Sequence, residues 1–159
     1  MVSDIDDTAR LVETTVGNSD IREFVTIHDS EIGDGCKIYE RTSIKKSTVS
    51  DNVDINAGSY VENATIESNV QIGPNSTVAG VTHELTEDGM TFRNDVFEPI
   101  VLREGVFLGA GTVVGPGVEV GKDAIIAAGG TVTDTVAART VVLGSPPDQQ
   151  RLRLDEWRR

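Results

Sequence analysis

Aliphatic residues recur every six positions over most of the chain, which fits neither the 3.6-residue period of a helix nor the two-residue period of an isolated strand. The aliphatic positions are Ile32, Ile38, Ile44, Val49, Ile55, Val61, Ile66, Ile72, Val78, Leu102, Leu108, Val114, Val120, Ile126 and Val132. They form groups of three, which begin at Ile32, Val49 and Ile66 before an interruption and at Leu102 and Val120 after it. Three short strands per group, stacked so that neighbouring groups share one core, explain this period.

A second set of residues follows the same period. Four positions after an aliphatic residue lies a small or β-branched one, at Cys36, Thr42, Val53, Ser59, Val70, Ser76, Val106, Thr112, Val118, Ala124 and Gly130. Glycine often follows the aliphatic residue directly, as expected where a backbone turns a corner. We therefore predict an all-β solenoid with two inward positions for each six-residue repeat.

The period fails between Val78 and Leu102, where its continuation falls on His83, Gly89 and Asp95. This break predicts one loop, residues 83–99, that protrudes from the solenoid. Loops held by a rigid scaffold are frequent sites of function. An imidazole held at the start of such a loop is suited to act as a general base near neutral pH.

Three segments are expected. Residues 1–20 have an acidic, helix-like pattern and are predicted to form a short N-terminal helix or extension that caps the first coil. Residues 21–145 form the solenoid. Residues 146–159 are predicted to form a C-terminal helical tail, with Leu154 and Trp157 on one apolar strip.

Composition narrows the choice of partners. The chain has 14 Lys and Arg against 26 Asp and Glu, a formal net charge of −12. Nucleic acids and anionic membranes are bound by clustered basic side chains, so neither is an expected partner. Only four of the basic residues are lysines, and such an acidic surface suggests adaptation to concentrated salt.

The expected location is cytoplasmic. The acidic N-terminus differs from a secretory leader, and no apolar run has the roughly 18 residues that a membrane helix needs. The single Cys36 forms neither an intramolecular disulfide nor a cysteine-based zinc site.

Three segments resemble the galactoside and maltose O-acetyltransferases of the hexapeptide-repeat superfamily. NVQIGPNSTVAGVTH, residues 69–83, is similar to the stretch that leads into the catalytic histidine of those enzymes. Residues 99–136 are similar to the coils that follow their loop, and VVLGSPP, residues 141–147, to their closing segment. The resemblance implies a left-handed parallel β-helix and a homotrimer with active sites between subunits.

The resemblance also implies a reaction. His83 falls on the general base, which would activate an acceptor hydroxyl for direct attack on acetyl-CoA. Cys36 occupies an inward position, so an acyl-enzyme intermediate is not expected. No metal is expected.

Contacts to coenzyme A are implied for Ala110, Ala128, Thr133 and Arg151. Packing alone would also explain small residues at the two alanine positions. Asp134 stands where those enzymes often have lysine, so Arg139, Arg151 or Arg153 would have to supply charge for the 3′-phosphate. A solvated arginine tail is the alternative interpretation.

Acceptor contacts are implied for Asn56 and Phe107, and Glu84 could orient His83 or bind a sugar hydroxyl. The alternatives are an exposed loop carboxylate for Glu84 and wall packing for Phe107. We expect His28 to lie on the surface.

Other activities remain open. N-acetylation of an amino-sugar nucleotide is the second candidate reaction, and a non-catalytic β-helix scaffold is the candidate without chemistry. A γ-class carbonic anhydrase needs three zinc-binding histidines. This chain has two, His28 and His83, more than three coils apart in sequence. Serine O-acetylation is disfavoured because only about 20 residues precede the predicted repeats, and that class carries a long helical N-terminal domain.

Overall fold

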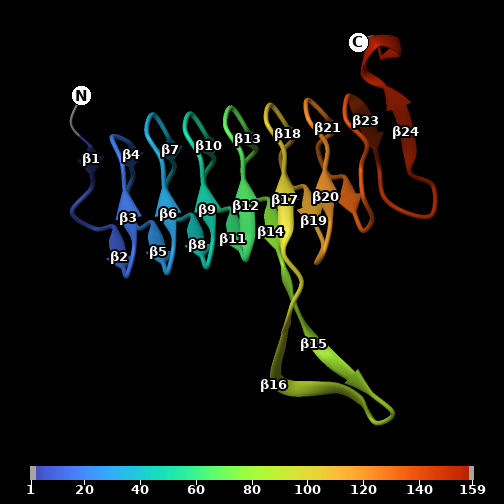
Figure 1. Ribbon diagram of the computed structural model, residues 1–159, viewed down its shortest axis with the longest axis horizontal. Coiled ribbons are helices and arrows are strands. Elements are labelled where there is room, and N and C mark those ends of the chain that lie inside the picture. Colours follow the sequence, from blue (N-terminus) through green and yellow to red (C-terminus); the bar gives the residue numbers. More distant parts are fainter. Residues whose placement is uncertain (1–2, 158–159) are drawn as a thin grey trace.

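Short parallel strands stack into the three walls of a left-handed β-helix, as the six-residue period predicts (Figure 1). The structure is a computed structural model and describes residues 3–157. The coils advance along one axis, and a single hairpin projects sideways from the wall between β14 and β17 (Figure 1).

The strands of each wall are as follows, in spatial order and within the described residues. The first sheet contains β1 (Asp4–Ile5), β4 (Asp20–Ile21), β7 (Lys37–Ile38), β10 (Asp54–Ile55), β13 (Gln71–Ile72), β18 (Phe107–Leu108), β21 (Ile125–Ile126), β23 (Thr140–Leu143) and β24 (Gln150–Arg153). The second contains β2 (Arg10–Val12), β5 (Thr26–His28), β8 (Ser43–Lys45), β11 (Tyr60–Glu62), β14 (Thr77–Ala79), β19 (Val113–Val114) and β22 (Thr131–Val132). The third contains β3 (Thr15–Val16), β6 (Glu31–Ile32), β9 (Thr48–Val49), β12 (Ala64–Ile66), β17 (Ile100–Leu102) and β20 (Glu119–Val120).

Equivalent residues of successive coils stack in register, so each wall buries one aliphatic column. In the first sheet this column is Ile21, Ile38, Ile55, Ile72, Leu108, Ile126 and Val142. Every member is at most 1% exposed. The predicted second inward positions are buried as well. No single coil could bury these side chains alone, so stacking is the main source of stability.

The buried serine and threonine hydroxyls are bonded to the main chain. Ser76 Oγ donates to the carbonyl of Gly109 at 3.3 Å, and the Thr112 N–H donates to Ser76 Oγ at 3.3 Å. Such bonds offset the cost of removing hydroxyl groups from water. Cys36 is buried as predicted, with Sγ 3.1 Å from the Ser50 carbonyl, and burial raises the pKa of its thiol.

The N-terminal helix prediction is wrong. Residues 4–16 form β1, β2 and β3, which pair in parallel with the next coil, so the solenoid begins before residue 20. Ile5, Leu11 and Val16 continue the aliphatic columns of the first, second and third sheets. Each lies 16 residues before its partner, whereas Ile21 lies 17 residues before Ile38. Counting back in steps of 17 residues therefore misses the aliphatic positions of the first coil by one residue.

The C-terminal helix prediction is also wrong for most of the segment. β24 pairs antiparallel with β23 and covers the edge of the first sheet, and the only helical turn in the described part of the tail is the 3₁₀ turn η1 (Leu154–Glu156). A strand satisfies the open edge of β23 directly, which a helix could not do. Leu154 and Trp157 are half-buried.

Candidate functional site

The predicted loop is an antiparallel hairpin of β15 (Val81–Thr86) and β16 (Gly89–Phe97). It leaves the solenoid at Gly80, whose N–H donates to the Glu62 carbonyl at 2.8 Å and whose carbonyl accepts from the Glu98 N–H at 2.9 Å. A Cβ on Gly80 would lie 2.5 Å from the Asn63 carbonyl oxygen. The hairpin therefore starts from a fixed point on the wall that tolerates only glycine without rearrangement.

A large bulge bends the hairpin. His83 pairs with Asp95 and Leu85 pairs with Met90, so residues 91–94 lie opposite Glu84 alone. Asn94 Nδ2 donates to Glu84 Oε2 at 2.6 Å across this bulge. Glu84 is thus exposed and bonded within the hairpin to Asn94 rather than to His83.

His83 lies in β15 beyond the corner, two residues into the projecting strand, instead of at the corner itself. Its Nε2 is 3.7 Å from Asp95 Oδ1, and the two side chains are 43% and 50% exposed. At that distance the two side chains interact electrostatically but are too far apart for a hydrogen bond. The carboxylate lies where it can orient the ring, and the pairing involves Nε2 rather than Nδ1.

Two polar side chains of β11 lie at the base of the hairpin. Glu62 is only 9% exposed and accepts a hydrogen bond at 3.2 Å from Tyr60 Oη. Lys45 Nζ lies 5.5 Å from the centre of the Tyr60 ring. The pKa of Tyr60 is raised by burial first, and then by the negative charges of Glu62 and Asp95. Tyr60 on the wall is therefore close enough to Asp95, the partner of His83, for that charge to affect its pKa.

Tyr60, Glu62 and Asp95 were not among the residues predicted for the site. Asp95 falls on the continued six-residue count, which identified it as a non-core position but gave no partner. The pairing of Asp95 with His83 depends on hairpin register, and a bulge makes that register unreadable from the sequence.

The hairpin also exposes apolar side chains. Leu85, Met90, Phe92 and Phe97 are 73%, 58%, 83% and 47% exposed. Lys46 Nζ lies 4.7 Å from the centre of the Phe97 ring, which ties the base of the hairpin to the preceding coils.

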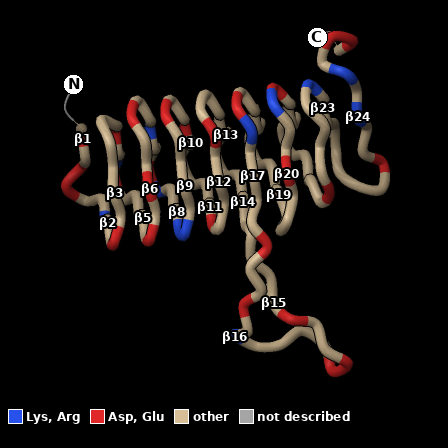
Figure 2. The backbone as a smooth tube through the Cα atoms, in the orientation of Figure 1, with Lys and Arg blue, Asp and Glu red and all other residues tan. Residues whose placement is uncertain are grey.

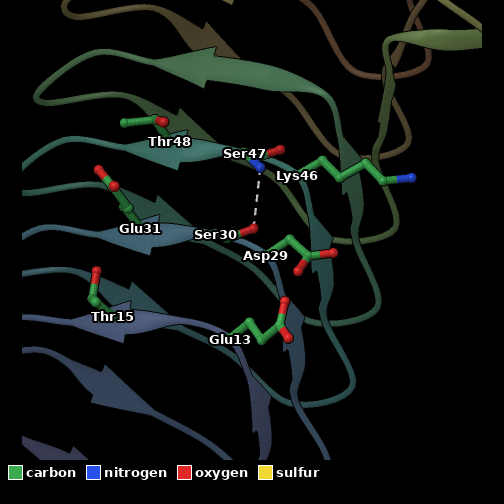
Figure 3. A pocket seen from close by; sticks show the side chains of 8 residues that line it. All are labelled: Glu13, Thr15, Asp29, Ser30, Glu31, Lys46, Ser47 and Thr48. Atoms are coloured by element: carbon green, nitrogen blue, oxygen red, sulfur yellow. Dashed lines mark hydrogen bonds between the residues drawn. The ribbon is translucent and has the colours of Figure 1, made fainter.

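An open groove of about 500 Å³ runs along the same corner toward the N-terminus (Figure 3). It is lined by Glu13, Thr15, Asp29, Ser30, Glu31, Lys46, Ser47 and Thr48. Figure 3 shows the Ser30 hydroxyl bonded to the Ser47 N–H, a link between coils. The lining includes three carboxylates and one lysine, so it carries a net negative charge.

The other predicted acceptor residues lie away from His83 within one chain. Asn56 Nδ2 donates to the Ile72 carbonyl at 2.9 Å, at the corner before the second sheet, whereas the hairpin leaves from the corner after it. Phe107 is 42% exposed on the outer face of the first sheet. His28 is half-buried rather than fully on the surface, and its Nε2 is buried without a hydrogen-bond partner.

The predicted coenzyme A residues form two groups. Ala110 and Ala128 are exposed at one corner of successive coils, where the Gly129 N–H donates to the Ala110 carbonyl at 2.9 Å. The Cβ of an alanine at position 109 would lie 2.5 Å from the Ala128 nitrogen, so this corner is tightly stacked.

The second group lies at the C-terminal end. Thr133 is exposed beside Asp134, and Asp134 Oδ1 is 2.7 Å from Arg151 Nη2. Arg153 is paired with Asp155. Arg139 is exposed, and its main chain is bonded to Lys122 and Leu154. Asp134, which stands at the expected lysine position, is thus paired with Arg151.

Charge is distributed unevenly. Acidic residues follow the corners of the coils and the hairpin, and basic residues are prominent in β24 (Figure 2). Within residues 3–157, no cluster of three His, Cys, Asp or Glu is arranged to hold a metal. Over the same residues no helix is long and apolar enough to cross a membrane.

The fold and the projecting hairpin define a protein of the hexapeptide-repeat superfamily. The family described as "Bacterial transferase hexapeptide (six repeats)" matches residues 99–134. The family described as "GlmU-like, C-terminal hexapeptide" matches residues 1–102, more than half of the chain. The chain belongs to this GlmU-like hexapeptide family.

Curated relatives match a short part of the chain. A 2,3,4,5-tetrahydropyridine-2,6-dicarboxylate N-acetyltransferase of Staphylococcus aureus (strain bovine RF122 / ET3-1) is 50% identical over 48 residues. The match covers 30% of this chain and 20% of the relative. The same enzyme from strain JH9 is 48% identical over 48 residues, with the same coverage. The chain therefore matches about one fifth of the length of these relatives.

Solved structures share the fold. A variant of AntD, an N-acyltransferase from Bacillus cereus in complex with dTDP-4-amino-4,6-dideoxyglucose and coenzyme A, has a TM-score of 0.80 at 15% identity, covering 89% of this chain and 83% of that one. A hexapeptide-repeat acetyltransferase from Vibrio cholerae has a TM-score of 0.58 at 24% identity, covering 90% and 71%. PerB from Caulobacter crescentus, in complex with coenzyme A and GDP-perosamine, has a TM-score of 0.51 at 19% identity, covering 95% and 54%.

Proposed function

We propose that the chain is an acetyl-CoA-dependent acetyltransferase that acts on a hydroxyl of a sugar-like acceptor, with His83 as general base. The observation that carries this proposal is the His83–Asp95 pair on a hairpin fixed to a rigid solenoid. A general base is commonly oriented by a further group, and the Asp95 carboxylate, 3.7 Å from the imidazole, would take that role.

The reaction would proceed by direct transfer. His83 takes the proton of the acceptor hydroxyl as its oxygen attacks the thioester carbonyl of acetyl-CoA. The carbon–sulfur bond then breaks, the acetyl ester is released, and the proton held by His83 neutralises the coenzyme A thiolate. Backbone N–H groups would stabilise the negative oxygen of the intermediate. Cys36 takes no part, because it is buried in the core.

The donor is supported by the relatives. AntD and PerB were both solved with coenzyme A. We place the donor against the Ala110 and Ala128 corner, where small side chains leave the backbone accessible. Thr133, Arg139 and Arg151 would complete the site from the C-terminal end.

We further propose a cytoplasmic homotrimer. Ala110 and Ala128 lie at the corner between the first and second sheets, whereas the hairpin that carries His83 leaves between the second and third. A second subunit would bring the two together. The exposed apolar residues of the hairpin would then contact a neighbouring chain.

N-acetylation of an amino sugar nucleotide is the second candidate. It is favoured by the names of the relatives, which include N-acetyltransferases and an N-acyltransferase bound to an amino sugar nucleotide. The same base would accept the proton that the amine loses on acylation.

The test is release of coenzyme A thiol from acetyl-CoA with a panel of maltose, a galactoside, glucosamine and dTDP-4-amino-4,6-dideoxyglucose. His83→Ala is expected to lower turnover by about 10²-fold or more, the usual contribution of a general base. His28→Gln is the matched control, because His28 is the only other histidine and lies on a distant coil. Full activity of His83→Ala, or absence of both turnover and acetyl-CoA binding in the wild type, would reject the proposal.

A further inference from the structure

Glu62 is an unusual carboxylate for a wall of this solenoid. It is nine-tenths buried, and its hydrogen-bond partner is the Tyr60 hydroxyl at 3.2 Å. No Lys, Arg or His nitrogen lies within ion-pair distance of it in the described part of the chain. Burying a carboxylate that has one hydrogen-bond partner and no counter-charge is costly, and a ligand that donates to it would offset that cost.

Lys45 is in register with Glu62 on the preceding coil but does not pair with it. Its Nζ instead lies over the Tyr60 ring, 5.5 Å from the centre. Lys45, the register partner of Glu62, therefore lies over the neighbouring aromatic ring and does not neutralise the carboxylate.

The residues that follow Glu62 in register on the next two coils are small. Ala79 is its register partner on the next coil, and Gly115 follows Val114, the partner of Val78, on the coil after that. Neither residue has a side chain beyond a methyl group. Small side chains thus follow Glu62 along this row of the second sheet, and the hairpin begins at Gly80 and Val81, directly after Ala79.

We propose that Glu62, held by Tyr60, binds the acceptor through a hydrogen-bond donor on the sugar ring, either a hydroxyl or an ammonium group. The ring would lie over Ala79 and Gly115, beside the hairpin that carries His83. This inference rests on the proposed function, and it names a specificity-determining residue that the resemblance did not supply.

The first test needs no acceptor. Glu62→Gln keeps an oxygen for the Tyr60 hydroxyl and removes the buried charge, so its melting temperature at pH 7.5 should exceed that of the wild type by about 2 °C or more. Glu23→Gln, an unpaired carboxylate at a distant corner, is the control and should shift melting by less than about 1 °C. A loss of about 2 °C or more in Glu62→Gln would assign Glu62 to the structure and overturn the proposal.

The second test measures kinetics with the same acceptor panel. Glu62→Gln should raise the acceptor KM about tenfold or more, the effect of losing a hydrogen bond to a charged group, while the KM for acetyl-CoA changes less than about twofold. A larger effect on amine acceptors than on hydroxyl acceptors would identify the bound group as an ammonium. An unchanged acceptor KM would refute the role of Glu62. A wild type inactive on every acceptor would instead reject the proposed function, and the melting comparison would still decide whether Glu62 is structural.

Discussion

Replacing Ile72 by alanine should destabilise the solenoid strongly, because this side chain lies in the middle of a stacked column. It is 0% exposed and in register with Ile55 on one side and Leu108 on the other. Both neighbours are held by backbone ladders, so the coils cannot collapse into the space that is left.

The magnitude follows from the atoms removed. Losing three buried carbons costs about 2.4 kcal/mol at about 0.8 kcal/mol for each. The cavity raises the cost to about 3–5 kcal/mol, the upper part of the range for such substitutions. For a chain of this size that loss corresponds to a fall in Tm of about 6–20 °C.

Urea unfolding followed by circular dichroism at fixed salt and protein concentration measures this effect. Ile72→Val should cost about 0.5–1.5 kcal/mol, since it removes one carbon. Ile5→Ala should cost about 1 kcal/mol, because Ile5 is 39% exposed in the first coil. A cost below about 1 kcal/mol for Ile72→Ala would refute the reasoning that the stacked column carries the stability.

Three further predictions concern other parts of the molecule. Cys36 should react with a thiol reagent only as fast as the protein opens, because its side chain is 1% exposed and burial also raises the pKa of its thiol; rapid labelling of the native protein would contradict this. The pKa of Glu67 is lowered below its ordinary value of 4.5, first by the hydrogen bond from Arg103. The stabilisation that Glu67 contributes is therefore present above about pH 4.5, and it is lost as the pH falls through the lower pKa of the folded state. Glu67→Gln should therefore be less stable than the wild type at pH 7 and equal to it under strongly acidic conditions, and a pH-independent difference in urea unfolding would count against this account. The melting temperature should rise with KCl, because salt screens the net charge of −12; a flat dependence would oppose salt adaptation.

The solenoid was predictable because its core is a local, periodic pattern. One aliphatic residue per strand specifies the inward face, and stacking places equivalent residues together without long-range rearrangement. The first coil escaped detection because Val16 lies one position closer to Ile32 than Ile32 does to Val49. The last strand, β24, was mistaken for a helix because an antiparallel edge pairing leaves no period in the sequence.

The candidate site was predictable only in part. The break in the period located the hairpin and His83, but not the residue that faces it. Asp95 lies opposite His83 in a hairpin whose register is shifted by a bulge. Glu62 lies one coil earlier, in register with Ala79, the last residue of β14 before the hairpin. Such contacts depend on three-dimensional pairing rather than on spacing along the chain.

Chemical rescue tests the central claim most directly. The rate of coenzyme A release would be measured for wild type and His83→Ala with increasing imidazole, at a fixed concentration of acetyl-CoA and the best acceptor of the panel. If His83 is the general base, imidazole should restore part of the lost activity in His83→Ala and leave the wild type unchanged. Equal rates for the two proteins without imidazole would contradict the assignment of His83 and the reaction built on it.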